Sequence, residues 1–170
     1  MYSLAEEHSL ASSSLLAILP TLAKEWRLAL QIRPTSYLDT WASVLQLTTG
    51  GKVGQHGDRT PAIFFRKNER VLISSSCGGV PNYQPLTKEK AALPPLREWS
   101  EIEVGQREED GEFTFYISLY GEQVHYTRNS QPREFTNVKI YASNPWHPAQ
   151  PGSIRNLIVE TKVEGERADP

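Results

Sequence analysis

Two carboxylates in the segment 101–106, which has the sequence EIEVGQ, have the spacing that chemistry would need. Glu101 and Glu103 are two positions apart, so in a strand both side chains point to one face, as the acid and the nucleophile of a glycoside hydrolase must. Gln106 stands where such a strand would carry a further acid, so the proton donor is missing. Because short motifs are degenerate, we favour a solvated strand face over a catalytic pair.

The other reactive side chains form no recognisable catalytic or zinc motif. The four histidines lack a ligand spacing such as H-x-x-x-H,. The run Ser74–Ser76 precedes Cys77 without the G-x-S-x-G pattern of a nucleophile elbow,. The glycine-rich segment 50–58 lacks the G-K-[ST] ending of a phosphate-binding loop,. We therefore predict that the chain is not an enzyme, and that it requires no cofactor.

Aromatic and polar residues on loops give the strongest binding signal. A flat apolar ring can stack on a sugar ring, and planar polar groups can bond its hydroxyls. Trp146 lies in a loop braced by Pro145 and Pro148, and its alternative role is to plug the end of the core,. The predicted ligand-binding residues are Trp146, His147, Tyr83, Asn82, His56 and Arg59.

Composition narrows the class of protein. The chain has 170 residues, enough for one domain with its own core, and a net charge of −2 that argues against nucleic acid as a partner,. Cys77 is the only cysteine, so no disulfide can form within the chain,. The longest apolar stretch contains Pro20 and falls short of the roughly 20 residues that cross a bilayer, so we expect no membrane insertion,.

The elements that must position these residues are short strands. In residues 25–33, Trp26, Leu28, Leu30 and Ile32 alternate with polar neighbours, and similar runs recur between Gly, Pro, Asn and Asp signals,. Hairpins are predicted to turn at residues 67–69 and at 121–122, and residues 41–49 form a strand with Trp41, Leu45 and Leu47 in phase,. Residues 78–96 are rich in proline and predict at most one short strand,.

The domain boundaries follow from the same pattern. Residues 1–13 are expected to be an N-terminal arm, where Ser3 and Glu6 have the spacing of a helix capping box,. Residues 14–163 form the sandwich, and residues 164–170 form a frayed polar tail,. Ten or more antiparallel strands exceed an immunoglobulin domain and predict an all-β fold, a two-sheet antiparallel jelly-roll sandwich.

The order of these strands resembles the laminin-G-like branch of the concanavalin A-like jelly rolls. The resemblance covers roughly residues 14–163 and is carried by a strand opened by tryptophan, a glycine-containing hairpin and a closing pair of strands joined by a long loop: Trp99, Ile102 and Val104; Ile117, Leu119, Gly121 and Val124; Val138 and Ile140; and Ile154–Leu157. It implies binding of glycans or of extracellular and matrix proteins by rim loops at residues 50–60, 78–88 and 143–152. It also implies an optional calcium ion, for which Asp58 and Asn144 are the candidate ligands,.

The leading hypothesis is therefore a non-catalytic module that recognises a glycan or an extracellular protein. One alternative is a structural protein that self-associates through sheet faces or edges, because Thr114, Tyr116 and Tyr120 and the pair Ala62 and Phe64 indicate apolar content on both faces,. The other is a jelly-roll glycoside hydrolase or lyase. Glu6, Glu7 and His8 stand where a signal peptide would be basic, which leaves an extracellular domain cut from a longer chain or an intracellular protein,. The resemblance to a mainly extracellular family implies the former.

Overall fold

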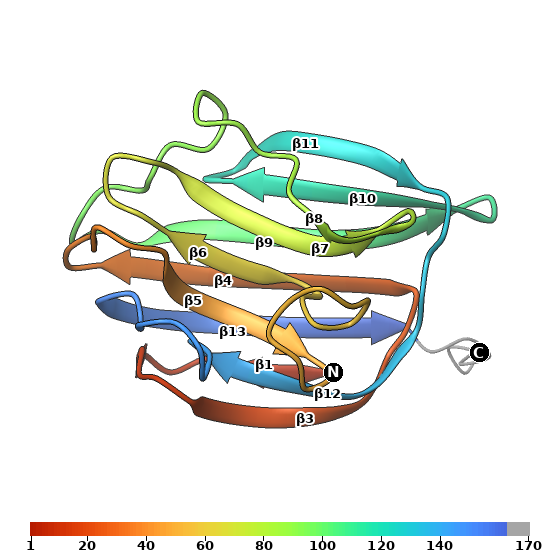
Figure 1. Cartoon of the computed structure of the whole chain (residues 1–170), viewed down its shortest axis with the longest axis horizontal. Coiled ribbons are helices and arrows are strands. Elements are labelled where there is room, and N and C mark those ends of the chain that lie inside the picture. The colour runs from red at the N-terminus through yellow and green to blue at the C-terminus, as the bar shows by residue number, and fades with distance from the viewer. Residues whose placement is uncertain (163–170) are drawn as a thin grey trace.

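The computed structural model describes residues 1–162, and these fold into two antiparallel sheets packed face to face (Figure 1). The seven-stranded sheet has the order β1 (Tyr2–Leu4), β13 (Gly152–Lys162), β4 (Glu25–Pro34), β9 (Ser100–Glu109), β10 (Glu112–Leu119), β11 (Glu122–Asn129), with β2 (His8–Ser9) also paired to β13. The six-stranded sheet has the order β3 (Ser14–Leu22), β12 (Phe135–Ala142), β5 (Ala42–Thr48), β6 (Ala62–Phe65), β7 (Val71–Cys77), β8 (Val80–Tyr83). The all-β jelly-roll prediction is confirmed.

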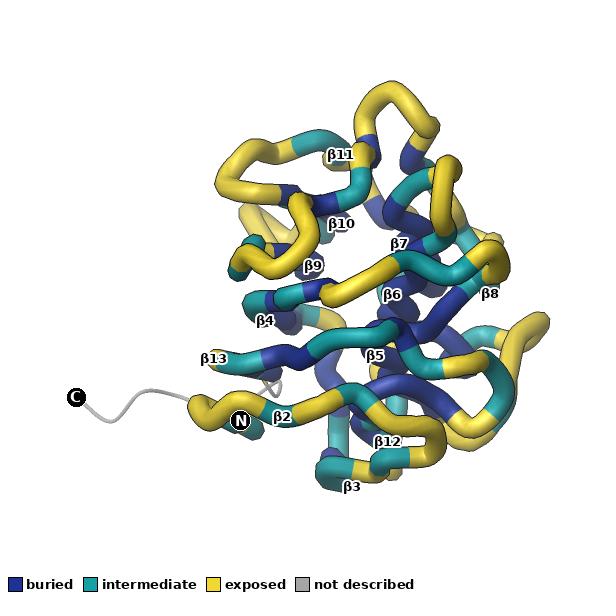
Figure 2. The backbone as a smooth tube through the Cα atoms, turned by 90° about the vertical axis from the view of Figure 1, so that its left-hand side faces the viewer, coloured by how far each residue is buried: buried dark blue, intermediate teal, exposed yellow. Residues whose placement is uncertain are grey.

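The core lies between the two sheets, where the buried segments of both layers face each other (Figure 2). Alternation along β4 works as the sequence predicts: Trp26, Leu28, Leu30 and Ile32 are at most 5% exposed, and the side chains between them, Ala29 apart, are only partly buried. Such alternation buries one face of a strand and leaves the other to water or to a ligand. The functional question therefore concerns the two outer faces and the ends of the sandwich.

The loop from β12 to β13 joins one sheet to the other across the end of the sandwich. It runs beside the start of β5, where Ser43 N–H donates to Pro148 O at 2.9 Å and Gln150 N–H donates to Ser43 O at 3.0 Å. The sequence prediction of two core strands joined by a long proline-braced loop is confirmed.

Three local predictions need correction. The capping-box helical turn at Ser3–Glu6 does not form, because β1 and β2 pair with β13. The hairpin of β10 and β11 turns at Tyr120 and Gly121, both with positive φ, one residue earlier than predicted. Trp41 is out of phase with Leu45 and Leu47, because the register shifts between Ser43 and Leu45, and such a β-bulge moves the preceding residues to the other face.

Other local predictions hold. Strands β6 and β7 form the hairpin around residues 67–69, and the segment 78–96 contains the single strand β8. The tail predicted for residues 164–170 lies outside the described residues. The described residues include no helix that could span a bilayer.

Candidate functional site

A hollow lies on the outer face of the six-stranded sheet. Its volume is about 240 Å³, and six residues, each from a different strand or loop, line it: Trp41, Arg59, Phe64, Leu72, Gln84 and His147. We call it the outer-face pocket. Three of the loops and turns predicted to carry the site contribute a residue to it.

Its floor is apolar because of strand periodicity and the β5 bulge. Phe64 on β6 and Leu72 on β7 are paired across the hairpin and point away from the core, whereas Ile63 and Ile73 point into it. The bulge brings Trp41 to the same outer face, where it packs against Phe64, Leu72 and Ala62 in a cluster separate from the core. The result is an aromatic patch, of the kind that sugar rings stack on.

Arg59 enters from the loop between β5 and β6. Its backbone is held by Ser76 N–H, which donates to Arg59 O at 3.2 Å. The guanidinium lies over the Phe64 ring, 4.8 Å from the centroid, and its Nη1 donates to Asn82 Oδ1 at 3.2 Å. The residue is only 8% exposed, and this burial lowers the pKa of the Arg59 guanidinium. Arg59 is therefore fixed in place as a buried cation at the pocket wall.

His147 also lines the pocket and is positioned by Asn144. Asn144 Oδ1 accepts the N–H groups of Trp146 at 2.9 Å and His147 at 2.8 Å, which turns the loop toward the sheet. The His147 ring meets Phe64 edge-on, with centroids 4.8 Å apart. Burial, and then the positive charges of Arg59 and Lys52, lower the pKa of His147, so its imidazole is neutral at pH 7,.

Strand β8 completes the site through alternate residues. Asn82 Oδ1 accepts hydrogen bonds from Arg59 Nη1, Ser74 Oγ and Gln84 Nε2, the last at 3.1 Å. Gln84 lines the pocket and is exposed, so its amide can meet a ligand. Tyr83, between these two, points the other way. The structure thus brings three of the predicted residues, Arg59, His147 and Asn82, into one cluster.

The other three predicted ligand-binding residues lie apart from the outer-face pocket. Tyr83 packs against the core, edge-on to Phe115, and its hydroxyl lies 2.9 Å from His125 Nε2, so it does not line the pocket. His56 Nδ1 lies 2.5 Å from Ser76 Oγ and does not line the pocket. Trp146 is half-buried and is not among the hydrophobic residues packed against the core.

The side chains of the two candidate calcium ligands form hydrogen bonds within the chain. Asn144 is fully buried, and its Oδ1 already accepts two backbone N–H groups. Asp58 is 8% exposed, and its Oδ2 accepts the N–H of Gln55 at 2.9 Å. Gln46 links the two loops, because it donates to Asp58 O at 2.8 Å and accepts from Asn144 Nδ2 at 2.7 Å. Within residues 1–162, no group of three or more His, Cys, Asp and Glu side chains is placed to hold a metal.

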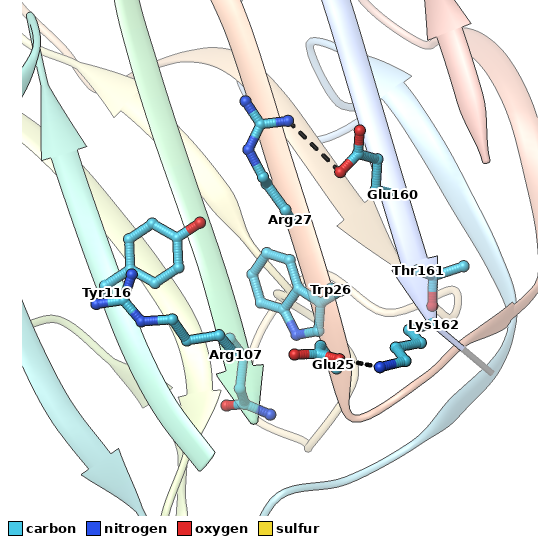
Figure 3. A pocket seen from close by; sticks show the side chains of 9 residues that line it. Glu25, Trp26, Arg27, Arg107, Tyr116, Glu160, Thr161 and Lys162 are labelled. Carbon is cyan, nitrogen blue, oxygen red and sulfur yellow. Dashed lines mark ion pairs between the residues drawn. The ribbon is translucent and has the colours of Figure 1, made fainter. Parts of the chain in front are cut away.

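A second hollow, of about 310 Å³, lies at the seven-stranded sheet (Figure 3). Its charges are paired: Arg27 lies 3.0 Å from Glu103 and 3.6 Å from Glu160, and Lys162 lies 3.6 Å from Glu25. Tyr116 OH also donates to Glu103 Oε2 at 2.8 Å. Glu103 is thus engaged by two partners, which favours the structural interpretation of the Glu101 and Glu103 pair over the catalytic one.

The fold defines the class of the protein as a jelly-roll sandwich of the concanavalin A-like kind. A Ruminococcus gnavus CBM40 module bound to α2,3-sialyllactose matches with a TM-score of 0.60 and 13% identity, over 94% of each chain. The Caenorhabditis elegans galectin LEC-6 matches with a TM-score of 0.54 and 13% identity, over 91% of this chain and 95% of the galectin.

A heptameric pentraxin from Limulus polyphemus also matches, with a TM-score of 0.57 and 9% identity, over 90% of this chain and 74% of that one. No model of a protein family matches the chain, and no curated protein matches it in sequence. The neighbours therefore define the jelly-roll fold and leave the laminin-G-like branch undistinguished within it.

Sequence reasoning missed the floor of the site. Phe64 and Leu72 lie in a hairpin that the sequence predicts, and Ala62 and Phe64 stand out as apolar residues on the second face. That signal was interpreted as an oligomer interface. The sequence predicts Trp41 in phase with Leu45 and Leu47, because nothing in residues 41–49 marks the bulge.

Proposed function

We propose that the chain is a non-catalytic module that binds a glycan in the outer-face pocket. The observation that carries the proposal is the joining of an apolar floor, Trp41 and Phe64, to polar groups on Arg59, Gln84 and His147 around one hollow. Sugar recognition combines these two features, a ring for stacking and planar groups for hydroxyls. A hollow of about 240 Å³ suits one or two sugar rings, so the affinity should lie between about 1 mM and 1 μM,.

The neighbours support this proposal at the level of the fold. Two of them are, by name, a carbohydrate-binding module with a bound oligosaccharide and a galectin. The proposal also includes a finer assignment: a laminin-G-like domain that binds glycans or matrix proteins outside the cell. Calcium is not part of the proposal, because the Oδ1 of Asn144 and the Oδ2 of Asp58 both accept backbone N–H groups.

The test is a glycan-array screen of the purified protein, run with calcium and again with chelator, followed by titration of the best glycan. Trp41→Ala and Gln84→Ala should each weaken binding, the former by about tenfold, the value of one aromatic contact near 1.4 kcal/mol. Tyr126→Ala is the matched control, because this aromatic is 67% exposed on β11 of the opposite sheet. Equal losses of affinity in Trp41→Ala and Tyr126→Ala would contradict binding at the outer-face pocket. Loss of the array signal with chelator would show that binding needs calcium.

A second candidate function is self-association, favoured by one edge of the six-stranded sheet. Edge strand β3 carries Leu15 and Ile18, which are 47% and 52% exposed, and exposed apolar edges pair with other chains,. The surface first predicted for this role is different, since Tyr116 is only 6% exposed. A mass that rises with concentration, and stays monomeric in Ile18→Lys, would support this function.

A further inference from the structure

We propose that the outer-face pocket takes an acidic glycan, and that Arg59 pairs with its carboxylate or sulfate group. This inference rests on the proposed function and names the class of glycan for the same site. Its starting point is an imbalance of charge: Arg59 is a cation in the wall, and none of the six residues that line the pocket carries a carboxylate.

Within residues 1–162, the Arg59 guanidinium forms no ion pair with a carboxylate. The carboxylate whose charge acts on it is that of its chain neighbour Asp58, which does not line the pocket and whose Oδ2 accepts the N–H of Gln55. Further positive charge lies close by, because Lys52 acts on His147, and Arg70, which is also 4.0 Å from Glu69, lies 5.3 Å from the centroid of the Trp41 ring. An anion in the hollow would meet a positive field with no competing carboxylate in its lining.

The N–H donors of the Arg59 guanidinium are also only partly matched by acceptors in the described residues. A guanidinium has five N–H donors, and the protein supplies Asn82 Oδ1 for Nη1, while Nε is buried without a partner. A buried cation without a counterion is costly for a protein to maintain. The fold nevertheless holds this one rigidly between the Phe64 ring and Asn82. A planar carboxylate or a sulfate can supply both the charge and the missing acceptors, in the geometry that arginine favours.

The hollow on the other sheet shows that the imbalance is particular to this site. There Arg27 is paired with Glu160, and Lys162 with Glu25 (Figure 3). Arg27 is also paired with Glu103, at 3.0 Å. Arg107 lies over the Tyr116 ring and 3.9 Å from Glu109. Cations on that face have their counterions within the chain, so the same argument does not apply to it.

The experiment compares acidic glycans with their neutral counterparts on the whole chain. The probes are sialyllactose and its methyl ester, a glucuronate-terminated disaccharide and its methyl ester, and lactose with and without a 3′-sulfate, titrated at two salt concentrations. We expect at least one acidic probe to bind about tenfold to a hundredfold more tightly than its neutral counterpart, and the difference to shrink at high salt. The ester pairs report on a carboxylate, and the lactose pair reports on a sulfate.

The variant Arg59→Gln should bring the ratio of acidic to neutral affinity close to one, whereas Arg128→Gln, an exposed change on β11, should leave it unchanged. The ester comparison needs no variant, so it stands even where Arg59→Gln fails to fold. Equal binding of acidic and neutral probes would overturn the inference and leave the proposed function intact. A preference that survives in folded Arg59→Gln would overturn the role of Arg59, and no binding by any probe would overturn both.

Discussion

The buried amide of Asn144 offers the most detailed prediction, because it shapes the loop that carries His147. Asn144→Ala removes the hydrogen bond that its Nδ2 donates to Gln46 Oε1 at 2.7 Å and the two that its Oδ1 accepts from the N–H groups of Trp146 and His147. It also removes the contact of the Asn144 amide with His147 Nδ1, 3.1 Å from Nδ2. The two N–H groups lie in a partly exposed loop that water can reach. Water cannot reach Gln46 Oε1, because Gln46 is fully buried.

The expected cost follows from these environments. Each N–H that can turn to water loses about 0.5 to 1 kcal/mol, and the orphaned buried Gln46 oxygen costs about 1 to 3 kcal/mol. Together they predict that Asn144→Ala lowers the free energy of unfolding by about 3 kcal/mol. For a chain of this size, that corresponds to a fall in Tm of about 6 to 12 °C. Freed from Asn144, His147 should also leave the pocket wall, so glycan binding should weaken.

Asn129 provides a matched control for stability. It is also buried, its Nδ2 donates to Gln106 Oε1 at 2.7 Å, and its Oδ1 accepts the N–H groups of Gly78 and Gln131. Urea unfolding of both alanine variants should give similar losses, and glycan titration should show the larger effect for Asn144→Ala. A loss below about 1 kcal/mol in Asn144→Ala, with an unchanged slope, would refute the hydrogen-bond reasoning.

Three further predictions concern other parts of the molecule. Gly105→Ala should lower stability by about 1 to 3 kcal/mol in thermal unfolding, because the new Cβ would lie 2.7 Å from Tyr116 ring atoms; an unchanged Tm would contradict the packing,. His147 has its pKa lowered in the folded state, so its contribution to stability is complete above the unfolded value near 6.5 and is lost as pH falls; urea midpoints at pH 7 and 5 should differ less in His147→Gln than in the parent,. Cys77 is 6% exposed and burial raises its pKa, so its thiol should react with a disulfide reagent only at the rate of unfolding; fast reaction of the native protein would contradict its burial,.

The strands could be predicted from sequence wherever one face is apolar and the other polar. This holds for β4 and for β9, where Ile102 and Val104 are buried and Glu101 is exposed. The prediction failed where the pairing register of a strand, rather than its hydrophobic pattern, decides which face of the sheet a side chain occupies. The bulge at Ser43 turned Trp41 outward, and the pairing of β1 and β2 with β13 depends on a strand that is over 140 residues away in the sequence.

The site was half predictable, for a related reason. Polar residues on proline- and glycine-rich loops stand out in the sequence, and Arg59, His147 and Asn82 of this kind lie together at the proposed pocket. Phe64 was not, because an apolar residue on a strand has the same signature whether it faces a core or a ligand. Tyr83 packs into the core, whereas Asn82 before it and Gln84, just after the end of β8, lie on the outer face.

An NMR titration of the labelled protein with the best ligand from the array will show whether a glycan binds on the outer face of the six-stranded sheet. We expect the shifted amides and side chains to cluster at Arg59, Phe64, Gln84 and His147 and along β6 and β7. Shifts confined to the seven-stranded sheet, around the hollow of Figure 3, would contradict this expectation.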